Sequence, residues 1–285
     1  IYVYNMMTEV IDKANISYIK WDMNRCMTEV YSSCHDSESQ GRVMHEYILG
    51  VYQLYELLTN RFPEILFESC ASGGARFYPG MMYYAPQCWT SDDTDALERL
   101  KIQYGTSMVY PVSSLGAHVS AAPNHQLLRN TPIETRANVA YFGTFGYELD
   151  LNKLNMDEQI KVKEQITFMK DYREIIQFGT FYRLKSPFEG NETVWMVVSQ
   201  DQNTAIIGYY RTLQEVNVGY RRVKLLGLDP DKEYHVNLNN TVHYGDELMN
   251  LGLITTDSSC GENKEKYDGT NGDYLSRIYV LKAKI

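Results

Sequence analysis

The sequence lacks several features that would assign it to a specialised class of protein. None of its apolar runs approaches the roughly 18 residues that a membrane-spanning helix requires. Its 27 basic residues are outnumbered by 36 acidic ones, and the net charge of −9 argues against a nucleic-acid partner, whose phosphates this surface would repel. With 44% hydrophobic residues the chain is not disordered either. We therefore expect a globular protein with a neutral ligand and with no membrane or nucleic-acid partner.

The cysteines form no recognisable framework. There are five of them, an odd number without a CxxC pair, at Cys26, Cys34, Cys70, Cys88 and Cys260. This spacing predicts neither a disulfide scaffold nor a zinc site. Unpaired cysteines are typical of a reducing compartment, so we expect a cytoplasmic location.

The first residue is not a methionine, and no signal-peptide pattern follows it. Ile1 opens directly into an amphipathic helical stretch that ends near Ile11. Because proteins seldom begin in the middle of a structural unit, we expect the chain to be a piece of a longer protein.

The pattern of predicted elements changes near Thr180. Before it, predicted strands alternate with helices, which is typical of βα units and a parallel sheet. The predicted strands are 16–21, 65–68, 86–90, 108–112 and 144–149, and the helices after the opening one are 42–58, 94–104 with Ser91 as N-cap, 132–141 and 157–176. These five strands are too few for a closed eight-stranded barrel.

After Gly179 the pattern changes to short β-rich runs broken by glycine, proline, aspartate and asparagine. These runs are 181–184, 193–198, 204–210, 222–226, 234–238 and 277–281, and the polar stretch 261–272 is predicted to be an exposed loop. We therefore predict an α/β domain over residues 1–180 and an antiparallel β-sandwich over residues 181–285.

The first candidate site lies in Tyr18-Ile-Lys-Trp-Asp22. Side chains alternate along a strand, so Lys20 and Asp22 share one face. A lysine beside a carboxylate keeps that carboxylate anionic, which suits a nucleophile. The alternative is an ordinary ion pair that closes a strand.

The second candidate is a cluster of three acids, Asp92, Asp93 and Asp95, at a strand-to-helix corner. Repulsion between like charges raises the pKa of at least one of them, as a general acid requires. The alternative is that these acids stabilise the dipole of the following helix.

The third candidate is Glu68-Ser-Cys-Ala-Ser-Gly-Gly-Ala-Arg76, where two glycines allow the backbone to approach a ligand. It is neither a G-x-S-x-G elbow nor a dinucleotide fingerprint. Cys70 with His118 or His125 is a conceivable thiol nucleophile, although a packed cysteine is the commoner case. The two histidines are seven positions apart with no acid nearby, so we interpret them as hydrogen-bonding residues that order a loop rather than as a metal pair.

The spacing connects the first two candidates. Asp22 and Asp92 are 70 positions apart, about two units of a (β/α)₈ barrel at roughly 31 residues per unit. Asp22, Cys70 and Asp92 each lie at or just past the end of a successive predicted strand, where barrel active sites form.

These motifs resemble those of glycoside hydrolase family 36, the bacterial α-galactosidases. The motifs are Lys20-Trp-Asp-Met-Asn-Arg25, Cys70-Ala-Ser-Gly-Gly-Ala-Arg76, Trp89-Thr-Ser-Asp-Asp-Thr-Asp95, Gly116-Ala-His-Val-Ser120 and Pro123-Asn-His-Gln126. The resemblance implies a retaining enzyme with an N-terminal β-sandwich, a catalytic (β/α)₈ barrel and a C-terminal β domain. The predicted fold is then the C-terminal portion of such a barrel, about five of its eight strands, followed by the β-sandwich.

The resemblance also implies roles for individual residues. Asp22 is expected to be the nucleophile and Asp92 the general acid/base. The expected substrate-binding residues are Lys20, Asn24, Cys70, Gly73, Arg76 and Trp89, of which Trp89 is suited to stack on a sugar face. No metal or organic cofactor is required. The expected reaction is hydrolysis of terminal α-galactosides such as melibiose and raffinose through a covalent galactosyl-enzyme intermediate.

Three other interpretations stay open at this point. The chain could come from an α-N-acetylgalactosaminidase or from a galactosyl-transferring relative on the same scaffold, or it could be an inactive fragment that only binds carbohydrate. Five of eight strands leave about three strands, roughly 90 to 100 residues, to precede Ile1. We expect the full-length parent to be a homo-oligomer, a dimer or a tetramer.

Overall fold

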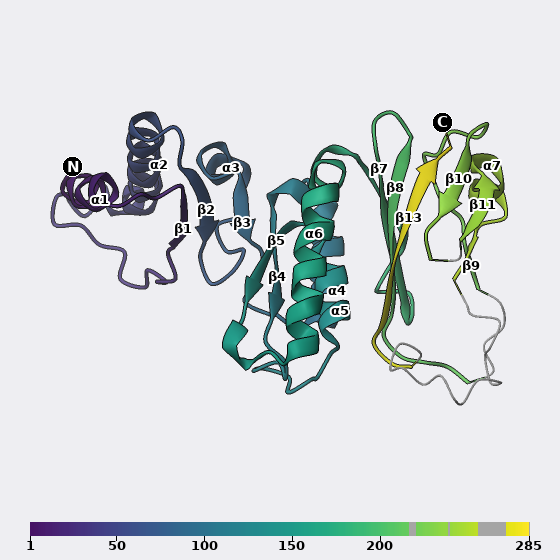
Figure 1. Ribbon diagram of the computed structural model, residues 1–285. Coiled ribbons are helices and arrows are strands. Elements are labelled where there is room, and N and C mark those ends of the chain that lie inside the picture. Colours follow the sequence, from purple (N-terminus) through teal and green to yellow (C-terminus); the bar gives the residue numbers. More distant parts are fainter. Residues whose placement is uncertain (217–220, 239, 256–271, 285) are drawn as a thin grey trace. The chain divides into compact units, whose positions relative to one another are not determined.

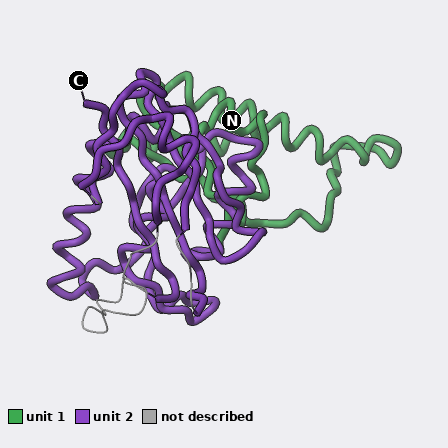
Figure 2. The backbone as a smooth tube through the Cα atoms, turned by 90° about the vertical axis from the view of Figure 1, so that its right-hand side faces the viewer, with its two compact units in different colours: residues 1–92 green, residues 93–285 purple. Residues whose placement is uncertain are grey.

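The computed structural model describes residues 1–216, 221–238, 240–255 and 272–284 (Figure 1). Cys260 and most of the predicted loop 261–272 lie outside these residues. The chain forms two compact units, residues 1–92 and residues 93–285 (Figure 2). No helix in the described ranges has both the length and the apolar character needed to cross a membrane.

The first unit alternates helices with three parallel strands. Strand β1 pairs with β2, and β2 pairs with β3. Its elements are α1 (Tyr2–Lys13), β1 (Tyr18–Asp22), α2 (Val43–Arg61), β2 (Leu66–Cys70), α3 (Pro79–Tyr84) and β3 (Gln87–Trp89). Helix α2 buries Val51, Tyr55 and Leu58, which recur at helical spacing, and Tyr55 packs on Trp21 with ring centroids 4.5 Å apart. One face of the strands therefore packs against the helices, and the alternate side chains occupy the other face.

The second unit begins with two more strands that alternate with helices. Strands β4 and β5 pair in parallel, and a core of residues from α4, α5 and α6 packs with them. The elements are α4 (Ala96–Ser107), β4 (Leu115–Ser120), α5 (Ile133–Ala140), β5 (Thr144–Glu148) and α6 (Met156–Phe178). Helix α6 starts with a capping box, in which Asn155 and Glu158 each accept a hydrogen bond from the other's backbone.

The rest of the second unit is an antiparallel sheet in the order β11-β10-β13-β8-β7-β6, with a two-stranded sheet of β12 and β9. Along β7, Val194 and Met196 belong to one buried core and Trp195 and Val197 to another, so both faces of this sheet are covered. The elements are β6 (Thr180–Lys185), β7 (Glu192–Val198), β8 (Thr204–Arg211), β9 (Arg222–Val223), β10 (Glu233–Val236), β11 (Thr241–Tyr244), α7 (Gly245–Asn250), β12 (Leu253–Ile254) and β13 (Leu275–Ala283).

The structure corrects two local predictions. The segment 108–112 is not a strand: it forms turns after α4 with Met108 and Val109 exposed, and the fourth strand is β4, seven positions later. Helix α4 is capped by Asp95 rather than Ser91, because the Asp95 side chain accepts hydrogen bonds from the backbone of Leu97 and Glu98.

Several short elements were not predicted at all, namely α3, α7, β11 and β12. The compact units divide the chain at residue 92, because β4 and β5 belong to the same unit as the antiparallel sheet. The domain boundary at 180/181 stays a prediction.

Candidate active site

The register of β1, β2 and β3 places the predicted site residues on one face. Lys20 lies opposite Glu68, and Asp22 lies opposite Cys70. On the next strand, Glu68 lies opposite Gln87. Because side chains alternate, Asp22, Cys70 and Trp89 fall on the face that the helices do not cover, at the carboxyl ends of their strands.

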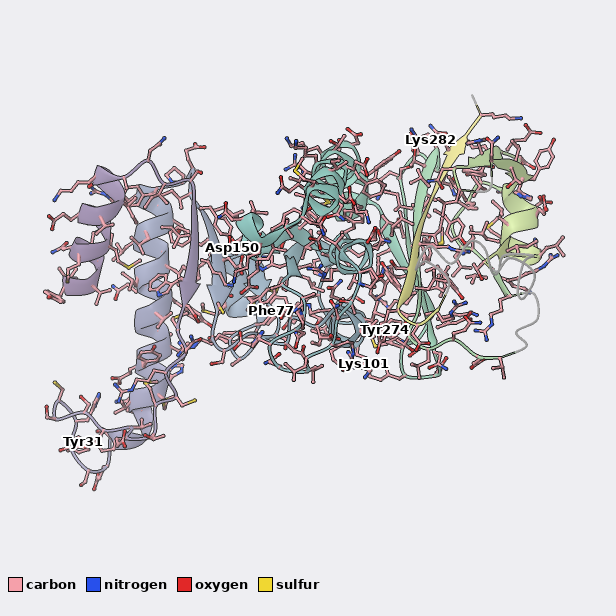
Figure 3. The ribbon with its side chains drawn as sticks, turned by 60° about the horizontal axis from the view of Figure 1, so that its bottom comes forward. Tyr31, Phe77, Lys101, Asp150, Tyr274 and Lys282 are labelled. Carbon is pink, nitrogen blue, oxygen red and sulfur yellow. The ribbon has the colours of Figure 1, made fainter. Side chains whose placement is uncertain are left out.

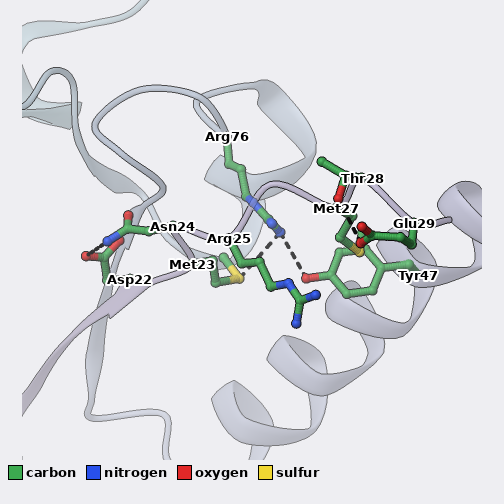
Figure 4. A pocket seen from close by; sticks show the side chains of 9 residues that line it. All are labelled: Asp22, Met23, Asn24, Arg25, Met27, Thr28, Glu29, Tyr47 and Arg76. Carbon is green, nitrogen blue, oxygen red and sulfur yellow. Dashed lines mark hydrogen bonds between the residues drawn. The ribbon is translucent and has the colours of Figure 1, made fainter.

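Asp22 has two polar partners. The Asn24 amide donates a 2.7 Å hydrogen bond from Nδ2 to Oδ2 of Asp22 (Figure 4). Cys70 lies directly opposite Asp22 in the register of β1 and β2, so its thiol is the second polar neighbour of the carboxylate. Asn24 also accepts a 2.6 Å hydrogen bond from the backbone N–H of Ser72. Asn24 therefore links the Asp22 carboxylate to the glycine-containing loop that follows β2. Asp22 itself is exposed.

That loop also packs against the segment that carries Asp92. Gly73 has φ +78°, and a Cβ added there would lie 2.6 Å from the Cα of Ser91 and 2.9 Å from the backbone nitrogen of Asp92. Gly74 would meet the carbonyl oxygen of Thr90 at 2.8 Å. Both glycines thus allow an approach of backbone to backbone, which no side chain would permit. One loop therefore connects the surroundings of Asp22 with those of Asp92.

The Lys20 ammonium lies between a carboxylate and an aromatic ring. Its Nζ is 3.9 Å from Oε1 of Glu68 and 4.8 Å from the centre of the Trp89 ring. Trp89 is itself buried, with 3% of its surface exposed. In this geometry the indole contacts the lysine through a cation–π interaction.

Cys70 is unsuited to act as a thiolate nucleophile. Burial raises the pKa of the Cys70 thiol to about 11, the Gly73 backbone opposes this shift, and the nearby Asp22 side chain adds to it. The two histidines considered as its base are engaged elsewhere or exposed. His118 lies on β4, 3.2 Å from the Glu148 carboxylate, and His125 is exposed in the following loop.

Two of the three clustered acids have structural contacts. Asp95 caps α4 and forms an ion pair with Arg129. Asp93 accepts a 3.0 Å hydrogen bond from the backbone N–H of Asp95. Stabilisation of the helix start, the alternative interpretation of this cluster, therefore accounts for Asp95 and Asp93. Asp92 is exposed, and no hydrogen bond to its carboxylate is present within the described part of the chain.

Arg76 lies away from Asp22, on the far side of a pocket of about 450 Å³ (Figure 4). Its guanidinium donates to the hydroxyl of Tyr47 at 3.3 Å and contacts the sulfur of Met23 at 3.6 Å. The pocket is lined by Asp22, Met23, Asn24, Arg25, Met27, Thr28, Glu29, Tyr47 and Arg76. Arg76 thus joins the loop after β2 to helix α2.

Most lining residues of this pocket were not predicted as site residues. Apart from Tyr47 on α2, they belong to the long loop between β1 and α2, whose outer part carries Tyr31 and extends past the first turn of α2 (Figure 3). A loop at the carboxyl end of a parallel strand is where binding residues collect, and that position was the available signal. No local sequence pattern predicted the contacts of Tyr47 and Glu68, because these contacts join different elements.

The site contains no grouping of side chains that could hold a metal ion. Among the described residues, no three histidine, cysteine, aspartate or glutamate side chains converge in this way.

Family models match both regions of the chain. Residues 1–179 match the family Melibiase, and residues 192–281 match the Glycosyl hydrolase family 36 C-terminal domain. The chain is 49% identical over 282 residues to Alpha-galactosidase AgaA of Geobacillus stearothermophilus, covering 99% of this chain and 37% of that protein. It is 44% identical over 282 residues to Alpha-galactosidase Mel36A of Lactobacillus acidophilus, with the same coverage. The chain thus spans little more than a third of these relatives.

Solved structures give the same result. The crystal structure of AgaA, described as a GH36 α-galactosidase, superposes with a TM-score of 0.92 over 99% of this chain and 38% of that one, at 49% identity. A variant of AgaA in complex with raffinose superposes equally well at 48% identity. This agreement confirms the predicted fold class, a C-terminal portion of a barrel enzyme with an antiparallel β region. The chain therefore belongs to glycosyl hydrolase family 36, with a melibiase region followed by the C-terminal domain of that family.

Proposed function

We propose that this chain carries the two catalytic carboxylates of a retaining α-galactosidase, which releases terminal α-D-galactose from oligosaccharides such as melibiose and raffinose. One observation carries the proposal. The Asp22 carboxylate is held at the end of β1 by the Asn24 amide, opposite Cys70, and the loop that binds Asn24 packs on the backbone of Asp92.

The two carboxylates differ in the way that a double displacement requires. Asp22 accepts a hydrogen bond from the Asn24 amide, which fixes the direction of its carboxylate, so we assign it as the nucleophile that attacks the anomeric carbon. Asp92 is exposed and has no such donors, so it protonates the leaving oxygen and then takes a proton from the attacking water. In retaining enzymes the nucleophile and the acid/base lie about 5 Å apart and act in this order.

The remaining predicted residues have different roles in this proposal. Lys20 offers a cation on the same face as Asp22, and the buried Trp89 ring contacts that cation. Cys70 is a protonated donor next to the nucleophile. Gly73 and Arg76 act on the shape of the loops, because Gly73 packs on backbone and Arg76 contacts Tyr47.

The relatives support the assignment of both carboxylates. One structure of AgaA with raffinose carries an Asp-to-Asn substitution, and one with stachyose carries an Asp-to-Ala substitution. These two aspartates are 70 positions apart in AgaA, which is the separation of Asp22 and Asp92 here. Substitution of a reacting carboxylate is an effective way to keep a bound substrate intact.

The test is hydrolysis of 4-nitrophenyl α-galactoside by the full-length protein that carries this chain. Asp22→Ala should lower kcat by at least about 10³-fold, because the covalent step has no other nucleophile. Asp171→Ala, an exposed aspartate on α6, is the matched control and should retain full activity. A variant Asp22→Ala with more than about a tenth of wild-type activity would overturn the proposal.

We also propose a homo-oligomer and a cytoplasmic location. Exposed apolar side chains on α1, such as Tyr2 (75%) and Val10 (62%), are typical of a surface that further protein covers, either another part of the full-length protein or a second copy. The exposed free thiols of Cys26 and Cys34 support a reducing compartment. Light scattering on the purified full-length protein tests the first proposal and would contradict it by giving the monomer mass.

A further inference from the structure

A completely buried carboxylate lies directly beneath the proposed sugar site. Glu68 on β2 has an exposed fraction of 0% and is the residue opposite Lys20 in the sheet register, two positions before Cys70. Burying an ionised carboxylate is costly unless it is both paired and hydrogen-bonded. The groups that surround Glu68 therefore indicate the role of its charge.

Three side chains from the neighbouring strands converge on Glu68. The Tyr18 hydroxyl donates to Oε2, and the Gln87 amide donates to the same atom at 2.7 Å. The Lys20 ammonium is 3.9 Å from Oε1. Tyr18 and Gln87 are neutral, and of these three side chains Lys20 is the one that brings a positive charge to the buried carboxylate.

The same contacts restrict the Lys20 side chain. A free lysine side chain samples many rotamers, and a flexible ammonium binds sugar hydroxyls poorly. Here the ammonium is held between the Glu68 carboxylate and the Trp89 ring, on the same strand face as Asp22. Its side chain still has 33% of its surface exposed, so it is accessible to a ligand.

We propose that Glu68 is a positioning residue of the active site, whose buried carboxylate fixes the Lys20 ammonium where it contacts the galactose hydroxyls. This inference rests on the proposed function, in which Lys20 binds the sugar. Glu68 itself does not touch the substrate: it acts through Lys20.

A double-mutant cycle tests this coupling in the full-length protein. Glu68→Gln keeps the shape of the side chain and an amide oxygen that can accept from Tyr18 and Gln87, but removes the charge. It should lower kcat/KM for 4-nitrophenyl α-galactoside roughly 10- to 100-fold, since a small misplacement of a binding group has an effect of this size. In a Lys20→Met background, the same substitution should change kcat/KM by less than about twofold, because the group through which Glu68 acts is gone. Glu64→Gln, an exposed carboxylate just before β2, is the matched control and should have no effect in either background.

Stability gives a second readout that does not depend on activity. Lys20→Met should lower Tm because it leaves a buried charge without its cation, and adding Glu68→Gln should restore part of that loss. Should Glu68→Gln fail to fold on its own, Glu68→Asp, which keeps the charge but shortens its reach, takes its place in the cycle.

The outcomes distinguish a failure of the role proposed for Glu68 from a failure of the proposed function. A fall in kcat/KM that is equally large in both backgrounds, or no fall in the wild-type background, would overturn the role of Glu68 and leave the proposed function intact. Absence of α-galactoside hydrolysis by the wild-type protein would overturn both.

Discussion

The conformation of Gly73 connects the surroundings of the two proposed catalytic carboxylates. Its φ of +78° is in the left-handed region, and its missing side chain lets the loop after β2 lie on the backbone of Ser91 and Asp92. The same loop donates a backbone hydrogen bond to Asn24, which in turn donates to Asp22. A displacement at Gly73 is therefore transmitted to both carboxylates.

A Gly73→Ala substitution should lower kcat/KM at least about 100-fold, because a 1 Å misplacement of catalytic groups has an effect of this size. The added Cβ would lie 2.6 Å from a Cα atom, so the loop must move. Gly50→Ala is the control: this glycine lies in α2 with no atom within 4 Å of the added Cβ, and alanine should raise stability by up to about 1 kcal/mol. Steady-state kinetics of both variants is the measurement, and an active Gly73→Ala enzyme would contradict this account of the loop.

At the residue scale, the sequence motifs named residues that lie together in the structure, and the catalytic and binding roles of these residues stay predictions. Asp22, Asn24, Cys70 and Gly73 all lie within two short motifs, and they contact one another. The pairing of Lys20 with Glu68 depends on the register of two strands, and no local pattern specifies that register.

At the scale of elements, β6, β7 and β8 are joined by one carboxylate. Glu192 at the start of β7 forms ion pairs with Lys185 of β6 and with Arg221, whose Nη1 lies 2.7 Å away, and it accepts a 2.5 Å hydrogen bond from the Tyr209 hydroxyl of β8. Burial opposes ionisation, but the hydrogen bonds from Arg221, Lys185 and Tyr209 outweigh it and lower the pKa of Glu192 to about 2.

This shift predicts a pH dependence of stability. A carboxyl whose folded pKa is depressed stabilises the fold above its unfolded pKa of about 4.5, and the contribution is lost as the pH falls towards 2. Allowing for solvent screening, Glu192→Gln should lower the free energy of unfolding by about 1 to 2 kcal/mol at pH 7. Urea unfolding of wild type and variant should show this difference shrinking between pH 4.5 and 3.

Glu189 is an exposed residue in the turn between β6 and β7. Glu189→Gln is therefore the matched control and should leave the free energy of unfolding unchanged. A Glu192→Gln difference that stays constant with pH would show that the charge of Glu192 does not contribute.

Strand prediction succeeded where the residues have a strong pattern and failed where burial decides. The alternation in 16–21 and the apolar run in 65–68 locate β1 and β2 to within two residues at each end. The fourth strand was placed on Met108-Val-Tyr-Pro-Val112, which has the higher β propensity, whereas β4 is Leu-Gly-Ala-His-Val-Ser. Five of these six residues are buried, so packing against the core selects this segment over its propensity.

At the scale of the whole molecule, one region carries both proposed catalytic carboxylates and the other carries a sheet covered on both faces. The chain spans 37% of the length of AgaA and of Mel36A. Activity is therefore a property to be measured on the full-length protein, and the roles of Asp22 and Asp92 are best tested there together.

Chemical rescue with azide distinguishes the two roles by the product. In the full-length protein, Asp22→Gly acting on an α-galactoside with an activated aryl leaving group should form β-galactosyl azide, because azide enters the space of the missing nucleophile, opposite the departing aryl oxide. Asp92→Gly should form α-galactosyl azide, because azide then attacks the covalent intermediate on Asp22 and no general base is needed. Nuclear magnetic resonance of the products identifies the anomer in each case. Exchanged anomers, or no azide product from Asp22→Gly, would contradict the assignment of Asp22 as the nucleophile.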